Sequence, residues 1–181
     1  MEPTTANLTG LNGNAFALAP QLTARGGASG VTVRADVCQL STAGLTKVAS
    51  GADTGFWVPY VTAKACVGFA SGAKAWIASG PFSGCEFAIG RRGSDGAIFA
   101  AHIARESGST GVADWEAYSA ANDLKVWYRN AIPLPDKGAY SCSYVFARCE
   151  GNELKSLVRI DLRTPGMGGS DGTVFNVHTF K

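Results

Sequence analysis

Two side chains in this sequence have the types and the spacing to perform chemistry together. Cys85 is followed by His102 seventeen residues later, and the segment RRGSDG (91–96) lies between them. A free thiol has a pKa of about 8.5, so only a small fraction is thiolate at neutral pH. A histidine within hydrogen-bonding reach can take the thiol proton and leave a nucleophilic thiolate. The pair therefore predicts acyl-transfer chemistry if the fold brings the two side chains together.

A β-hairpin with its turn in this glycine-rich segment would make that contact. If Gly93-Ser94 forms a type II′ turn, Cys85 lies directly opposite His102, with Cβ atoms roughly 5 Å apart. If Asp95-Gly96 forms a type I′ turn instead, the two residues share a face but lie two ladder pairs apart. A three-residue loop places them on opposite faces. The spacing permits the contact without requiring it.

The hairpin sequence is nearly repeated at the other histidine. GSDGAIFAAH (93–102) and GSDGTVFNVH (169–178) both read Gly-Ser-Asp-Gly, a variable residue, Ile or Val, Phe, two more residues and His. Alternation along a strand points Phe99 and Phe175 away from the histidine of each copy, toward a core. The two copies indicate that both segments favour a β-hairpin, and do not indicate that both histidines belong to one functional site.

The second histidine has no thiol partner at hairpin distance. Asp161 stands seventeen residues before His178, and no cysteine follows Cys149. We therefore expect His178 to be a satisfied strand histidine outside the site. Cysteine is often a buried core residue, which is the expectation for the other four. These are Cys38, Cys66, Cys142 and Cys149.

The residues around Cys85 also resemble a known motif. FSGC (82–85) is similar to the Leu-Ser-Gly-Cys motif of the bacterial glutamine deamidase toxins, namely the cytotoxic necrotizing factors and Burkholderia lethal factor. A histidine follows within one hairpin in those toxins, and the chemoreceptor deamidase CheD has a similar Cys-to-His spacing. In the lethal factor and in CheD a threonine lies six residues before the cysteine, and Ser79 occupies that position here. The resemblance covers residues 79–102 and departs from the motif at Phe82 and Ser79.

The resemblance implies deamidation of a protein glutamine to glutamate with release of ammonia. In that scheme Cys85 is the nucleophile, His102 is the base, and Ser79 orients the imidazole. Backbone N–H groups around Ser83, Gly84 and the cysteine would hold the oxyanion, and no metal or organic cofactor is needed. The partner would be a host protein, such as a small GTPase or a translation factor.

Two other classes of function remain open. The first is another Cys-His acyl-transfer enzyme, a peptidase or a transglutaminase. Papain-like peptidases carry the cysteine on a helix and the histidine far downstream, so the short Cys85–His102 spacing favours deamidation. The second is a β-rich binding module without catalysis, in which Cys85 is one more buried thiol.

Most of the chain reads as short strands with period-two alternation, separated by glycines. One segment, 109–123, has Ser109 or Thr110 as a possible cap and predicts a helix, and a weaker helix pattern at 14–25 is interrupted by Pro20. Alternation also turns Glu86 away from Cys85, where we expect it to be solvated or to pair with Arg91 or Arg92. The expected strands are 31–38, 56–62, 65–70, 73–78, 84–90, 97–104, 125–129, 140–146, 158–163 and 173–180.

These elements predict a β-rich α+β fold, with two packed mixed sheets in a β-sandwich-like core and a few peripheral helices. The length of 181 residues and the even composition favour a single catalytic domain over 1–181.

Composition excludes several classes of partner. A net charge of +2 without a basic run argues against nucleic acid, and no apolar run is long enough for membrane insertion. Five cysteines without a Cys-x-x-Cys pair argue against structural zinc and a disulfide framework, and fit a reducing compartment. The start, MEPTT, lacks the layout of a signal peptide. We expect a monomer, secreted by a specialised system and active in the host cytosol.

Overall fold

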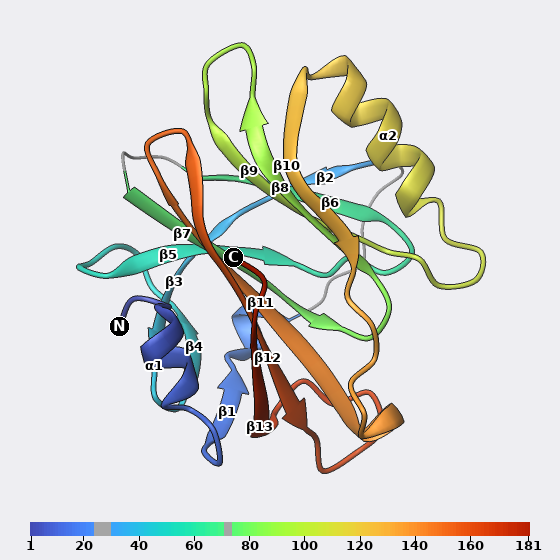
Figure 1. The fold of residues 1–181 in the computed structure, drawn as a ribbon. Helices are drawn as coiled ribbons and strands as arrows, with labels where there is room; N and C mark the ends of the chain where they lie inside the picture. Colours follow the sequence, from blue (N-terminus) through green and yellow to red (C-terminus); the bar gives the residue numbers. More distant parts are fainter. Residues whose placement is uncertain (24–29, 71–73) are drawn as a thin grey trace.

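A computed structural model describes residues 1–23, 30–70 and 74–181, and its strands form two sheets (Figure 1). The first is a closed barrel in the order β1 (Ala15–Leu18), β13 (Gly172–Thr179), β12 (Glu153–Arg163), β11 (Ser141–Glu150), β7 (Lys74–Phe82), β5 (Thr54–Pro59), β3 (Asp36–Ser41), β4 (Gly44–Lys47). The second is a five-stranded sheet in the order β10 (Leu124–Ala131), β8 (Glu86–Arg92), β9 (Ile98–Ile103), β6 (Ala65–Ala70), β2 (Thr32–Val33). The helical elements are α1 (Thr5–Thr9), α2 (Gly111–Ala121) and the 3₁₀ turns η1 (Pro20–Leu22) and η2 (Gly138–Tyr140).

The expected β-rich α+β class with mixed sheets is confirmed, but the sandwich-like core is wrong because one sheet closes on itself. Strand β1 completes the closure by pairing antiparallel with β13 and parallel with β4. Residues on an open sheet and on a closed one alternate in the same way, so the pattern along each strand does not reveal closure.

The helix expected over 14–25 is also wrong, and this segment supplies the closing strand. Phe16 and Leu18 are buried in the barrel, while η1 begins at Pro20. Residues 24 and 25 of the expected helix lie outside the described part of the chain. Pairing with two other strands outweighs the weak helical pattern, because it satisfies the backbone and buries both apolar side chains.

Most of the other expected elements are present. Strand β6 has the expected bounds and the other expected strands overlap observed ones, but the strand expected over 31–38 is divided between β2 and β3, which belong to different sheets. Residue 73 lies outside the described part. Strand β4 was not expected. The expected helix within 109–123 is confirmed as α2, which follows Thr110 as its N-cap residue. The Thr110 hydroxyl donates to Asp114 (2.6 Å), while Oγ of Ser109 accepts from the N–H of Gly111 (3.0 Å).

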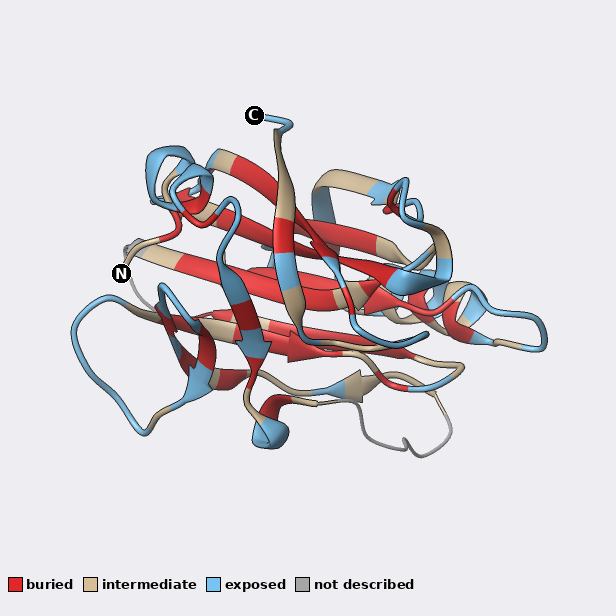
Figure 2. Cartoon of the chain, turned by 90° about the horizontal axis from the view of Figure 1, so that it is seen from below, coloured by how far each residue is buried: buried red, intermediate tan, exposed pale blue. Residues whose placement is uncertain are grey.

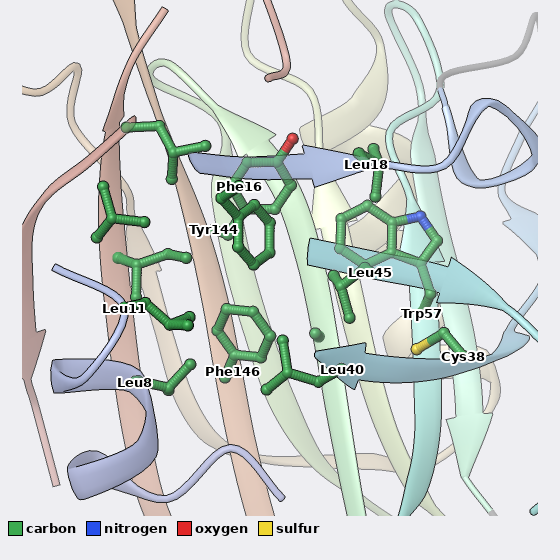
Figure 3. Close-up of a cluster of buried hydrophobic side chains, with 14 of the residues drawn as sticks. Leu8, Leu11, Phe16, Leu18, Cys38, Leu40, Leu45, Trp57, Tyr144 and Phe146 are labelled. Carbon is green, nitrogen blue, oxygen red and sulfur yellow. The ribbon is translucent and has the colours of Figure 1, made fainter. Parts of the chain in front are cut away.

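Three apolar clusters hold the layers together. The first fills the barrel, where Phe16, Tyr144 and Phe146 pack with Trp57 and Cys38 (Figure 3). The second lies between the outer face of the barrel and the five-stranded sheet, and the third lies between that sheet and α2. Strand β9 is buried along its whole length because both of its faces are covered. Seen from below, the stacked strands are mostly buried, and exposed residues lie in the loops around them (Figure 2).

Candidate active site

The two sheets meet where the chain passes from β7 to β8. Strand β7 belongs to the barrel and β8 to the five-stranded sheet, and FSGC (82–85) connects them. Residues Ile77 and Ser79 lie on the barrel face turned toward the five-stranded sheet, since Ala78 between them faces the barrel core. Residues of β7, β8 and β9 thereby face one another across the space between the layers.

The expected hairpin of β8 and β9 is present, but its turn differs from both expected turns. Arg92 pairs with Ala97 through the N–H of Arg92 (2.8 Å), so the loop contains the four residues 93–96. The Asp95 carboxylate holds this loop, because it accepts from the N–H of Ala97 (3.1 Å) and from Nε of Arg92 (2.9 Å). The predicted type II′ turn at Gly93-Ser94 is therefore wrong. The contacts of the Asp95 side chain within the loop help to set the register between β8 and β9.

This register places Phe87, not Cys85, opposite His102. Cys85 directly precedes β8, two residues before Phe87, and packs against the same apolar cluster as Phe87. Both candidate residues consequently face the barrel. Cys85 packs against the cluster between the layers, and His102 stacks on Phe82 of the same cluster with ring centroids 4.0 Å apart.

His102 is fully buried and has a defined tautomer. Its Nδ1 lies 3.0 Å from Oγ of Ser79, and the Ser79 hydroxyl donates to the carbonyl of Val58 (2.7 Å). Because the only hydroxyl proton is used on Val58, the imidazole must donate its Nδ1 proton to Ser79. Nε2 is then an unprotonated acceptor. The structure thus brings Ser79 into contact with His102, the pair of residues that the resemblance over 79–102 links.

Nε2 of His102 is the unusual atom of this region. It is buried and has no hydrogen-bond partner among the described residues. Burial lowers the pKa of His102 from about 6.5 to about 3, so the imidazole is neutral. An unsatisfied buried polar atom costs about 1–3 kcal/mol and calls for an explanation, which a catalytic role would supply.

Cys85 differs from the other cysteines in its exposure. It is partly buried and lines a cleft of about 490 Å³. Burial raises the pKa of its thiol, a hydrogen bond from the backbone N–H of Arg105 lowers it, and the Glu106 carboxylate raises it. The resting thiol is therefore neutral. The other four cysteines are buried, as expected, and burial is the main cause that raises their pKa values.

The proposed oxyanion residues lie in the same cleft. Ser83 and Gly84 line it beside Cys85. Gly84 has a φ of +128°, a backbone conformation that suits glycine, and no atom lies within 4 Å of where its Cβ would be. The turn that presents the thiol to the cleft therefore depends on the glycine of the FSGC motif.

The expected partners of Glu86 are wrong. Its carboxylate pairs with Nε of Arg129 (2.5 Å) and with Nε of Arg105 (3.5 Å). Strand β10 runs antiparallel to β8 and brings Arg129 alongside, an arrangement that alternation within one strand does not reveal. Of the two arginines expected instead, Arg92 pairs with Asp95.

His178 lies in a satisfied polar cluster, as expected. Its Nε2 is 2.8 Å from Oδ2 of Asp161 and 3.0 Å from Nδ2 of Asn176. The Asp161 carboxylate also accepts from Arg159 (2.5 Å) and from Ser143 (2.7 Å). The expectation for Phe175 is wrong: Phe99 is fully buried, whereas Phe175 is only partly buried and lies beneath Lys137.

Three residues of the cleft escaped the sequence analysis: Tyr60, Arg105 and Glu106. Tyr60 contacts His102 with ring centroids 5.2 Å apart and donates its hydroxyl to Oε1 of Glu106 (2.8 Å). Arg105 and Glu106 follow the histidine at the end of β9, which is a signal that could have found them. Tyr60 directly follows β5, far from Cys85 and His102 in the sequence, and no signal of this kind pointed to it.

Comparison with known proteins gives little further information. No protein-family model matches the chain, and no curated protein matches it. Among solved structures, the chain is similar to the C-terminal domain of CNFy from Yersinia pseudotuberculosis, with a TM-score of 0.34 and 15% identity. The alignment covers 59% of this chain and 53% of that domain. A similarity at this level establishes neither a common fold nor a common activity.

The described residues contain no group of three or more His, Cys, Asp or Glu side chains that could hold a metal ion. No helix in residues 1–23, 30–70 or 74–181 is long and apolar enough to span a membrane.

Proposed function

We propose that this chain is a protein-glutamine deamidase with Cys85 as nucleophile, His102 as base and Ser79 as the positioning residue. One observation carries the proposal. The Nδ1 proton of a fully buried imidazole is committed to Ser79, so the unpartnered Nε2 is available as a base. That imidazole packs against Tyr60, which lines the cleft containing the Cys85 thiol.

The reaction runs through a thioester. Nε2 of His102 takes the thiol proton while Sγ of Cys85 bonds to the carboxamide carbon of the substrate. The C–N bond then breaks, and Nε2 returns the proton to the nitrogen, which leaves as ammonia. Water attacks the thioester and gives its proton to Nε2. The C–S bond breaks, the thiol regains its proton, and the glutamine has become glutamate.

Proton transfer belongs to the substrate complex rather than to the resting protein. At rest the thiol and the imidazole are both neutral, and Nε2 of His102 has no hydrogen bond to Sγ of Cys85. Catalytic hydrogen bonds are often long in free enzymes and shorten when substrate binds. A rotation of the Cys85 side chain toward His102, driven by substrate in the cleft, would complete the pair.

The site residues also support a proposal for the substrate and the compartment. The resemblance over residues 79–102 favours a host protein as the glutamine donor, with a small GTPase or a translation factor as candidates. All five cysteines are free thiols, which fits action in a reducing host cytosol. We propose that the protein acts there as a monomer, without nucleic acid or a membrane.

The test is incubation of the purified protein with host-cell lysate, followed by peptide mass spectrometry. We expect the mass change of amide-to-acid conversion at specific glutamines with the wild type and none with Cys85→Ser. Serine differs by one atom, so the variant should fold, at a cost on the order of 1 kcal/mol. Cys149→Ser is the matched control and should retain activity, because that thiol lies outside the cleft.

The other outcomes separate the competing functions. New peptide ends would indicate a peptidase, and amine-linked glutamines a transglutaminase. Unchanged turnover by Cys85→Ser would contradict the nucleophile assignment and the deamidase proposal together.

A further inference from the structure

A carboxylate is built into the wall of the cleft beside Cys85. Glu106 lines the cleft, and its Oε1 accepts from the Tyr60 hydroxyl (2.8 Å) and from the N–H of Ala63 (2.5 Å). Both donors come from the connection that follows β5, whereas Glu106 follows β9. Short hydrogen bonds to an ionised acceptor are among the stronger ones in proteins. The carboxylate is therefore held in place before any ligand binds.

Its surroundings keep this carboxylate ionised. Partial burial alone would raise the pKa of Glu106, but hydrogen bonds from Tyr60 and from backbone N–H groups hold it below its usual value. Burial, together with the neighbouring Glu106, raises the pKa of Tyr60 to about 12, so this hydroxyl keeps its proton and remains a donor. The cleft consequently presents a fixed negative charge.

A nearby cation does not cancel this charge at Cys85. Arg105 also lines the cleft, but its guanidinium pairs with Glu86 at 3.5 Å. Glu106 raises the pKa of the Cys85 thiol by more than the charge of Arg105 lowers it. A ligand group close to the sulfur therefore meets a net negative field from these two side chains.

We propose that Glu106 is a specificity-determining residue that selects a carboxamide over a carboxylate next to Cys85. Its carboxylate would accept a hydrogen bond from the NH₂ group of the bound glutamine. After hydrolysis the same charge would repel the new glutamate carboxylate and speed its release. This inference rests on the proposed deamidase function and adds the means by which substrate and product are distinguished.

Two alkylating reagents reproduce this choice without the natural substrate. Iodoacetamide carries a carboxamide and iodoacetate carries a carboxylate. In both reactions the thiolate forms an S–C bond and iodide leaves. The ratio of the two rates at Cys85 cancels any change in thiol pKa and measures charge selection alone. Peptide mass spectrometry follows the modification of Cys85.

We expect this ratio to be about tenfold higher in the folded wild type than in urea-unfolded protein, an effect that a unit charge in the same cleft can produce. Glu106→Gln should bring it close to the unfolded value. Glutamine can still accept from Tyr60 and from Ala63, so the local structure should persist. Glu116→Gln, on the exposed side of α2 and outside the cleft, is the matched control and should keep the wild-type ratio.

An unchanged ratio in folded Glu106→Gln would overturn the inference, as would equal ratios in folded and unfolded wild type. If Glu106→Gln does not fold, salt provides a second measurement. The wild-type ratio should fall between about 0.01 M and about 1 M salt, as the Debye length shrinks from about 30 Å to about 3 Å. A salt-independent ratio would also overturn it.

The result is independent of the test of the proposed function. A protein that selects iodoacetamide through Glu106 but modifies no glutamine would contradict the deamidase proposal alone. A protein that deamidates glutamine with a ratio insensitive to Glu106 would contradict only the selection.

Discussion

The two histidines of this protein end nearly identical decapeptides, yet they lie in opposite environments. His102 is fully buried between the layers, with one ring nitrogen on Ser79 and the other without a partner. The side chain of His178 is 41% exposed, and its Nε2 contacts the Asp161 carboxylate. A similar local sequence thus leads to a buried, neutral imidazole with an unpartnered Nε2 at His102, and to an imidazole that is hydrogen-bonded within a polar cluster at His178.

Neighbouring strands account for the difference. His102 contacts Ser79 on β7, whereas His178 contacts Asp161 on β12 as well as Asn176 within its own decapeptide. The loops also differ, because residues 93–96 close a hairpin, while the second Gly-Ser-Asp-Gly ends where β13 begins. The chemical role of a histidine in a repeated motif therefore cannot be assigned before the residues on the adjacent strands are known.

The largest effect should come from removing the base itself. His102→Gln keeps much of the side-chain volume but has no group that can take a proton from Cys85. We expect the rate of glutamine deamidation to fall roughly 10²- to 10⁴-fold, the usual contribution of general acid–base catalysis. The assay is ammonia release from the substrate found in lysate. Loss of activity by folded His178→Gln to the same extent would remove the contrast between the two histidines.

Acid should destabilise the protein through His102. Its pKa is about 3 in the fold and about 6.5 without burial, so the unfolded chain binds more protons between these values. The stability contributed by the neutral imidazole is complete above about pH 6.5 and is lost as the pH falls toward about 3.

Urea titrations at two pH values measure this loss. Between about pH 7 and about pH 4, the wild type should lose about 3 kcal/mol more free energy of unfolding than His102→Gln. Equal losses in the wild type and in His102→Gln would contradict a buried neutral His102.

Ser79 should matter through the orientation of the imidazole. Ser79→Ala removes the acceptor of the Nδ1 proton, and we expect kcat to fall on the order of tenfold with little change in KM, as when a group that orients a functional histidine is lost. Ser79→Thr retains the hydroxyl and should restore most of kcat. If alanine and threonine at this position have equal kcat, Ser79 is not a positioning residue.

The smallest effect belongs to His178. His178→Ala removes one partner of the buried Asp161, which keeps its contacts with Arg159 and Ser143. We expect a loss of roughly 1 kcal/mol in the free energy of unfolding and catalysis within about twofold of wild type. A large catalytic defect in a folded protein would connect this polar cluster to the site.

Features that depend on near neighbours in the chain could be predicted from the amino-acid sequence. Alternation placed most strands and the apolar spacing placed α2, because side-chain direction repeats within a few residues. The spacing of Cys85 and His102 permitted a shared face without requiring it, and the observed four-residue loop has the parity that allows this arrangement. The assignment of Ser79 to His102 came from a resemblance, and the observed 3.0 Å contact agrees with it.

Contacts between groups that lie far apart in the sequence became visible only in the folded chain. Barrel closure depends on β1, whose two partners lie far along the chain from it and from each other. The register of the β8–β9 hairpin depends on contacts of the Asp95 side chain. The Glu106 carboxylate is held in the cleft wall by hydrogen-bond donors on the connection after β5. Such pairings are selected by the net free energy of burial and hydrogen bonding over the whole molecule, which no local pattern contains.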